Sequence, residues 1–337
     1  MQFRKKEIRN KIIIKNTIFI SSLLCLIRNN WILIWVFLEI NTLSFCSVIK
    51  RNTKTSKKEN DSSIKYFIIQ SIASGILLFF VVTKERYILH FLSMFATTAL
   101  IVKLAAAPFH EWFIKITKRM TWKNATILIT WQKLAPTYLI TFQEKTISFI
   151  FILLSSLIGA IFQINKKNVM EIIALSSVFN LRWILLAILI NIKTFVYFIT
   201  IYWISVTLII KVLQYSFNIN IIYFFSRRIR KWLVLFITAN LAGIPPFSGF
   251  LVKWVVFVLY LKIHITPLIS VILVIRTINF YIYLRLIKKT ILKPKRQNQI
   301  TRKSILKNLT IRTLIFSFSP LLLLVLRNAW KRTILIR

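Results

Sequence analysis

Apolar runs of about 20 residues recur along the whole 337-residue chain, and this repetition limits the possible folds more than any other feature. A helix needs roughly 20 apolar residues to cross about 30 Å of hydrocarbon. Eleven segments qualify, namely 12–27, 31–49, 64–83, 87–112, 123–142, 146–165, 169–192, 194–216, 231–262, 265–287 and 308–327. The sequence therefore predicts an all-α polytopic membrane protein, with a single transmembrane domain over 1–337.

Positive and negative residues are very unequal in number, since 48 Lys and Arg oppose 8 Asp and Glu, for a formal charge of +40. A soluble chain with this balance would be expected to bind nucleic acid, and a disordered polycation would need low hydrophobicity. Here 57% of the residues are hydrophobic, and the basic residues fall mainly between the apolar runs. This pattern excludes both classes. Two cysteines form no disulfide framework, and no glycine-rich phosphate-binding motif occurs.

The basic residues also predict how the chain is oriented. Segment 231–262 is too long for one straight span, because about 30 helical residues extend about 45 Å, and Pro245 and Pro246 break the helix. If this segment crosses once, one face carries the basic blocks at 4–11, 50–63, 115–123, 166–167, 227–231 and 288–307. If it crossed twice, the last block would move to the other face. Because basic residues concentrate on one side of a membrane, we predict one broken span, with the N-terminus on the positive face and the C-terminus opposite.

Charged residues inside the apolar segments are the candidate functional residues. They are Glu39, Lys103, Lys133, Lys211 and Lys253. A charge near the bilayer centre costs at least about 2.5–3.5 kcal/mol, so each is expected to have a function. Lys103 precedes Pro108, and Lys253 follows the double proline. Two broken helices, each with a nearby lysine, are typical of inverted-repeat transporters. We therefore predict half-repeats at 12–142 and 146–287, and a final helix at 308–327.

Proton transfer is the chemistry that these groups permit. A buried glutamate and lysine within reach stabilise each other's charged forms, and separating them allows the lysine to release its proton. Broken helices suit this task, because freed carbonyls and water are tolerated where backbone lines a cavity. Two structural alternatives stay open. A buried lysine can extend its ammonium group to the interface, and Glu39 can be the partner of one lysine without conducting protons.

His110 is a weaker candidate for the relay. It follows Pro108-Phe109 and precedes Glu111. One histidine and one glutamate are too few ligands for a metal site, so no metal is predicted. The alternative is that His110 is an interfacial residue at the end of a helix.

Four motifs carry a resemblance to a known family. They are LEIN at 38–41, KLAAAPFHEWF at 103–113, WQKLAP at 131–136 and GIPPFSGFLVKW at 243–254. In this order they resemble the antiporter-like membrane subunits of respiratory complex I and the related cation/proton antiporters. Each motif alone is modest, but four in register over nearly the whole chain are specific.

The resemblance implies a function and a location. It implies a proton-translocating subunit of NADH:ubiquinone oxidoreductase in the mitochondrial inner membrane, with the N-terminus in the matrix and the C-terminus in the intermembrane space. Its partners would be the other membrane-arm subunits and the lipid bilayer. It would not bind nucleic acid. NAD, FMN, iron–sulfur clusters and ubiquinone would be bound by those other subunits, and this chain would hold no cofactor.

The resemblance also implies roles for the buried charges. Glu39 and Lys103 would form the Glu–Lys pair of the family, Lys133 would be the central relay lysine, and Lys253 would be the lysine of the second broken helix. His110 falls on the family's histidine after Pro-Phe. Lys211 matches no motif. Two other functions stay open, a free-standing cation/proton antiporter and a purely structural membrane scaffold.

Three residues depart from the expected pattern. Asn180 stands where the family segment resembling 176–183 has a histidine, and Arg182 stands where it has a small residue. Arg276 likewise interrupts an apolar run. Many animal mitochondria read two standard Arg codons as Ser and one standard Ile codon as Met, and this chain contains many Ile but only 4 Met. We therefore hypothesise that some arginines and isoleucines reflect translation with the standard code.

This hypothesis predicts serine at positions 182 and 276 in the natural polypeptide. Peptide mass spectrometry covering Arg182 and Arg276 measures it directly. Finding arginine at both positions would end the hypothesis. The relay lysines are unaffected by it.

Overall fold

Helices make up all the regular structure in the described part of this computed structural model, which comprises residues 2–51, 57–84, 90–143, 145–166, 168–217, 235–244, 247–263, 275 and 277–285. The predicted all-α class is therefore confirmed. The chain divides into two units, Met1–Ile192 and Lys193–Arg337. Arg276 and the helix predicted at 308–327 lie outside the described residues.

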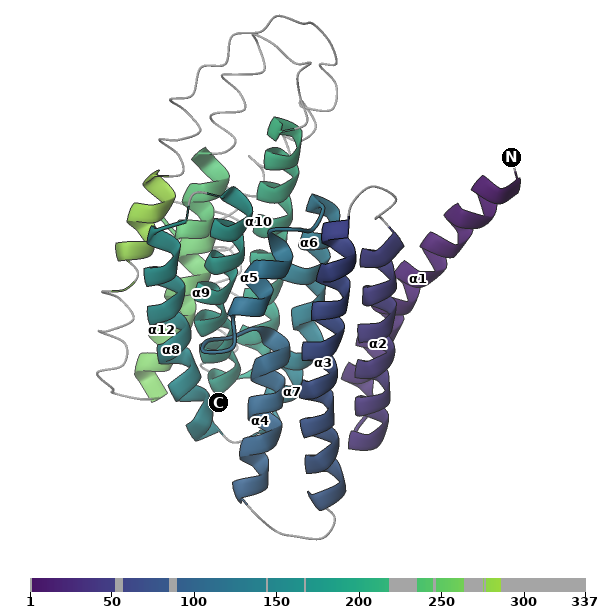
Figure 1. Ribbon diagram of the computed structural model, residues 1–337. Coiled ribbons are helices and arrows are strands. Elements are labelled where there is room, and N and C mark those ends of the chain that lie inside the picture. Colours follow the sequence, from purple (N-terminus) through teal and green to yellow (C-terminus); the bar gives the residue numbers. More distant parts are fainter. Residues whose placement is uncertain are drawn as a thin grey trace, which may run out of the picture. The chain divides into compact units, whose positions relative to one another are not determined.

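The first unit begins with helices that pack in chain order. They are α1 (Gln2–Ile27), α2 (Trp31–Arg51), α3 (Lys57–Lys84) and α4 (His90–Leu104). Each contacts the next, and Figure 1 shows α2, α3 and α4 side by side. The three-residue connection between α1 and α2 forces these two helices to run antiparallel. Trp35 Nε1 on α2 donates to the Ser74 carbonyl of α3 at 2.9 Å, which fixes their register.

The predicted break near Pro108 is present. α4 ends at Leu104, because Ala105 adopts a left-handed φ of 57°, which does not continue a right-handed helix. Pro108 then lacks the N–H that a helix needs. A short helix, α5 (Glu111–Thr117), resumes after the break.

A further interruption, which the sequence analysis did not predict, divides the segment expected at 123–142. It consists of α6 (Trp122–Ile129), a 3-10 turn η1 (Trp131–Lys133) and α7 (Leu134–Ile140). Thr130 Oγ1 donates to the Thr126 carbonyl at 2.7 Å, and Pro136 has no N–H for the Gln132 carbonyl. The Thr130 N–H also bonds the Thr126 carbonyl at 3.0 Å, and the chain then tightens, with the Lys133 N–H on the Thr130 carbonyl at 3.2 Å. The missing N–H of Pro136 removes the next α-helical bond after Lys133.

The centre of the first unit is α9 (Val169–Ile190), which is buried along nearly its whole length. It packs on α8 (Lys145–Ile164), and α5 and α7 contact it as well. Among the described residues, four helical segments are long and apolar enough to cross a membrane, Trp31–Lys50, Asp61–Thr83, Val169–Ile190 and Ile192–Gln214.

The second unit contains most of α10 (Ile192–Phe217), a helical segment at 235–242, α12 (Ser248–Ile263) and a helical segment at 277–285. The segment at 235–242 ends at Gly243, which has a φ of 77°. Asn240 Oδ1 accepts from the Gly249 N–H at 2.6 Å and from Ser248 Oγ at 3.1 Å. This side chain therefore caps the beginning of α12 across the interruption. Pro245 and Pro246 lie outside the described residues.

Two glycines on different helices predict opposite effects of the same substitution. A Cβ at Gly159 of α8 would lie 3.0 Å from backbone atoms of Phe179 on α9, whereas a Cβ at Gly75 of α3 would meet nothing within 4 Å. We expect Gly159→Ala to destabilise the protein by about 1–3 kcal/mol through overpacking. Gly75→Ala should leave stability unchanged or raise it by up to about 1 kcal/mol. The thermal unfolding midpoint in detergent measures both, and equal shifts would contradict the close approach of α8 and α9.

Candidate functional site

A small cavity in the first unit brings two of the predicted lysines together. Its polar lining consists of Asn41, Thr42, Tyr66, Gln70, Lys103, Gln132 and Lys133, and its apolar lining of Leu38, Leu104, Trp112, Phe113, Leu128 and Pro136. These residues come from α2 through α7, far apart in sequence. The water-sized space amounts to about 20 Å³, which exceeds the roughly 10–15 Å³ that one water needs. The cavity can therefore hold water beside the side chains of Lys103 and Lys133.

Lys103 reaches the cavity from the last turn of α4. Its side chain is buried, and its Nζ makes no hydrogen bond within the described residues. Its carbonyl oxygen accepts from Gln70 Nε2 of α3 at 3.5 Å. A buried ammonium group without a direct protein acceptor is costly, so the polar cavity is the place that can solvate it.

Glu39 lies on α2 within electrostatic range of Lys103. No ion pair within 4.0 Å joins the two described side chains, so attraction acts across a gap rather than through a salt bridge. Thr42 Oγ1 lies 2.8 Å from the Glu39 carbonyl and 3.2 Å from Glu39 Oε2, which orients the carboxylate. The structure therefore brings this predicted pair near each other without direct contact.

A pair of amides links the Glu39 helix to the Lys133 turn. Gln132 Nε2 donates to Asn41 Oδ1 at 3.1 Å, and both side chains line the cavity. The sequence analysis quoted both residues within motifs but assigned them no function. Both are amide side chains inside apolar runs, where an unpaired polar group is costly. This feature of the sequence could have indicated that each needs a polar partner.

Lys133 lies at the 3-10 turn and is buried. Its Nζ donates to Ser177 Oγ of α9 at 3.0 Å, and Ser177 Oγ in turn donates to the Ala174 carbonyl at 2.7 Å. The Nζ also lies 4.8 Å from the ring centroid of Phe113 on α5, which is a cation–π distance. Ser177 is a site residue that the sequence analysis missed, although a serine pair at 176–177 in an apolar run was the signal.

His110 lies at the break between α4 and α5, outside the lining of the cavity. It is buried, its Nδ1 is 3.0 Å from the Pro108 carbonyl, and its ring packs edge-on against Phe162 at 5.5 Å between centroids. These contacts hold the imidazole ring at the break. In the part of the chain that the structure describes, no three His, Cys, Asp or Glu side chains cluster as metal ligands.

The other two lysines belong to the second unit. Lys253 on α12 is buried, and its Nζ donates to the Leu241 carbonyl at 2.6 Å. In a continuous helix this carbonyl would accept from residue 245, which is a proline without an N–H. Lys253 therefore binds an acceptor that the sequence of the break leaves open. Lys211 on α10 is exposed. It is also the one of these lysines that matches no family motif.

Arg182 and Asn180 are both buried on α9. The Cζ of Arg182 lies 3.7 Å from the ring centroid of Phe179 and 5.3 Å from that of Trp183.

The comparisons with known proteins show the family to which the chain belongs. The model of the NADH:quinone oxidoreductase/Mrp antiporter transmembrane family matches residues 28–278. The chain belongs to this family. It is 32% identical to NADH-ubiquinone oxidoreductase chain 2 of Anopheles gambiae, over 93% of this chain and 95% of the relative. It is 31% identical to chain 2 of Pongo abelii, over 92% and 97%.

Solved structures share the fold at lower identity. A chain of respiratory complex I from Thermus thermophilus matches with a TM-score of 0.77 at 16% identity, over 89% of this chain and 74% of that one. A chain of the Mrp complex from Dietzia matches with a TM-score of 0.67 at 16% identity, over 88% and 37%. The family resemblance inferred from the four motifs is confirmed. The chain is a multi-pass membrane protein, homologous to chain 2, and a subunit of NADH:ubiquinone oxidoreductase.

The hydrogen bond from Lys133 predicts a difference between two adjacent serines. Ser177→Ala removes the acceptor of a buried ammonium group, which should lower stability by about 1–3 kcal/mol. Ser176 instead donates to the Ile173 carbonyl at 2.8 Å and does not contact Lys133, so Ser176→Ala should cost less than about 1 kcal/mol. The thermal midpoint of the solubilised complex compares them. A larger loss for Ser176→Ala would contradict the assigned contact.

Proposed function

We propose that this chain is a proton-translocating core subunit of the membrane arm, coupling electron transfer from NADH to ubiquinone to proton pumping. The single observation that supports this proposal best is the shared cavity of Lys103 and Lys133. Two buried ammonium groups next to a space for water are the elements of a proton relay. Redox cofactors belong to other subunits in this proposal, and electron transfer there drives the relay from outside.

Glu39, Lys103 and Lys133 form the relay of the first unit. When Glu39 is charged, it stabilises the protonated form of Lys103 by Coulomb attraction. Weakening that attraction from a neighbouring subunit favours release of the proton from Lys103. Water in the cavity and the Asn41–Gln132 amide pair then offer hydrogen-bonding groups toward Lys133. His110 acts at the break, as a weaker member of the relay.

Lys253 is the corresponding lysine in the second unit. Its bond to the Leu241 carbonyl holds it at the interruption before α12. In this proposal the interruptions near Pro108 and Gly243 belong to two inverted half-repeats, at 12–142 and 146–287.

The proposed topology has eleven spans in the mitochondrial inner membrane. The N-terminus faces the matrix, and the C-terminus faces the intermembrane space. The concentration of basic blocks on one face supports this orientation. The other membrane-arm subunits and the lipid bilayer are the partners.

Substituting the relay residues tests the function. At matching positions in a genetically tractable relative, Lys133→Ala and Glu39→Ala should reduce NADH-driven proton pumping, with a fall of about 100-fold for Lys133, because a positioned proton-transfer group contributes about 10²–10⁴-fold. Proton uptake by vesicles during NADH oxidation is the measurement. Lys211→Ala, at an exposed lysine, is the matched control and should pump normally.

The same variants separate the proposal from its alternatives. If the buried charges are only packing contacts of a membrane scaffold, both variants keep pumping once the complex has assembled, and the proposal is wrong. The family also includes Mrp antiporters, which makes a free-standing cation/proton antiporter the second candidate. Such an antiporter would assemble alone and exchange ions across vesicles without NADH oxidation.

A further inference from the structure

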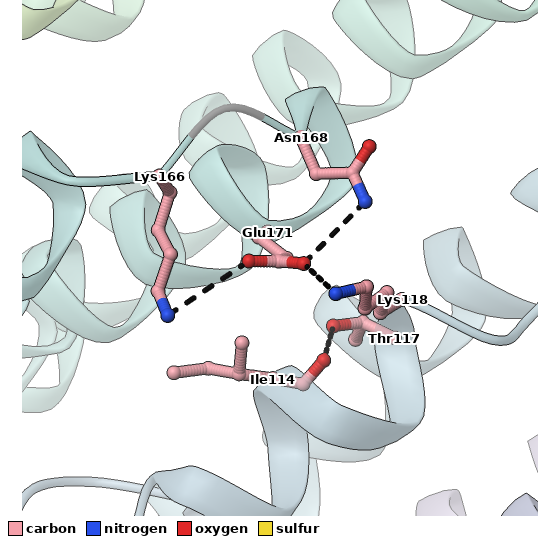
Figure 2. A network of polar contacts seen from close by, with 6 residues as sticks. All are labelled: Ile114, Thr117, Lys118, Lys166, Asn168 and Glu171. Carbon is pink, nitrogen blue, oxygen red and sulfur yellow. Dashed lines mark hydrogen bonds and ion pairs between the residues drawn. The ribbon is translucent and has the colours of Figure 1, made fainter.

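A buried carboxylate joins the end of α5 to the beginning of α9, outside the cavity described above. Glu171 lies in the first turn of α9, with 8% of its side chain exposed. Its Oε1 is 2.8 Å from Nζ of Lys118, the residue that follows α5, and its Oε2 is 3.9 Å from Nζ of Lys166. Figure 2 shows the two lysines on opposite oxygens, with Asn168 Nδ2 3.4 Å from Oε1.

Several physical factors favour this contact. The positive end of a helix dipole attracts a carboxylate in the first turn, and the negative end attracts a cation after the last turn. Glu171 and Lys118 are therefore each placed favourably. α5 has only seven residues, too few to be stable without packing. The chain contains only 8 acidic residues against 48 basic ones. Glu171 is one of these few carboxylates, and it lies near two lysines.

The two helices that this contact joins are the ones that supply the neighbours of Lys133. Phe113 of α5, whose ring lies under the Lys133 ammonium group, precedes Lys118 by about 7.5 Å along the chain at 1.5 Å per residue. Ser177 of α9, which accepts the Lys133 hydrogen bond, follows Glu171 by about 9 Å. The offset between α5 and α9 therefore determines whether both groups meet at Lys133.

We propose that Glu171 is a positioning residue for Lys133: through its bond to Lys118, it fixes α5 against α9 so that the Phe113 ring and the Ser177 hydroxyl meet at the Lys133 ammonium group. This inference rests on the proposed function. The exposed pair Glu111–Lys115 provides a contrast, because it is also 2.8 Å long but lies within α5 alone, with 67% of each side chain exposed.

Glu171→Gln tests the inference, because it removes the charge and nearly preserves the volume. In proteoliposomes containing the complete complex with the variant chain, protons pumped per NADH oxidised should fall by about 3- to 10-fold, the range expected for a residue that couples two elements. The quantity of assembled complex, measured on native gels, normalises the result.

Two matched variants separate positioning from a general loss of charge or stability. Glu111→Gln removes a carboxylate from an equally short ion pair that joins no two helices, and should pump as the unmodified chain does. Glu171→Asp keeps the charge, and the flexible Lys118 can follow it, so pumping should be largely restored. A purely structural role for the side-chain volume would instead make Glu171→Asp as defective as Glu171→Gln, or more so, and that result overturns the inference.

A third variant covers the case in which Glu171→Gln does not assemble. Lys118→Met keeps the apolar stem of an exposed side chain and removes only the ammonium group that joins α5 to Glu171. Lys166 lies between α8 and α9 and cannot replace this contact, so a fall of about 3- to 10-fold in pumping is expected, as for Glu171→Gln. Normal pumping in Lys118→Met and in any assembled Glu171→Gln overturns the inference.

The Lys133→Ala variant distinguishes failure of this inference from failure of the proposed function. If Lys133→Ala pumps normally, the proposed function itself fails. If Lys133→Ala fails to pump while Glu171→Gln pumps normally, only the positioning role is wrong.

Discussion

The cost of burying an ammonium group in an apolar chain governs the described structure. Lys103, Lys133 and Lys253 are each buried. Lys103 and Lys133 lie at interruptions of helices, and Lys253, inside α12, reaches back to a carbonyl before one. Inside a continuous helix each backbone carbonyl already accepts from the N–H four residues on, which leaves it a weaker acceptor for an ammonium group. An interruption frees carbonyls, admits water and leaves room for a polar partner. The interruptions therefore supply the polar groups and the space for water that a buried lysine needs.

The three lysines satisfy this requirement in different ways. Lys253 binds the carbonyl whose usual partner is replaced by a proline, Lys133 binds a serine hydroxyl and the face of a phenylalanine, and Lys103 faces the cavity. Only Lys103 has no direct hydrogen bond from its Nζ within the described residues. Its charge consequently depends most on Glu39 and on the contents of the cavity.

Much of the site could be predicted from the sequence because a charge in an apolar run is conspicuous. Glu39, Lys103, Lys133 and Lys253 were found that way, and the break near Pro108 followed from proline chemistry. Ser177, Asn41 and Gln132 were not found, because a hydroxyl or amide in a helix more often bonds its own backbone. The 3-10 turn at Lys133 was missed because Pro136 removes one N–H, and a proline alone does not identify how far before it the helix is interrupted.

The sequence by itself determined that the chain is helical, crosses a membrane and belongs to an antiporter-like family, because hydropathy, charge distribution and motif order are properties of local stretches. The tertiary structure decided which polar groups meet. It placed Lys103 and Lys133 on one cavity, left Glu39 near Lys103 without a salt bridge, and used Glu171 to join α5 to α9. These contacts depend on the relative offset and rotation of packed helices. Residue spacing along one helix contains no information on the offset of its neighbour, so only packing could settle them.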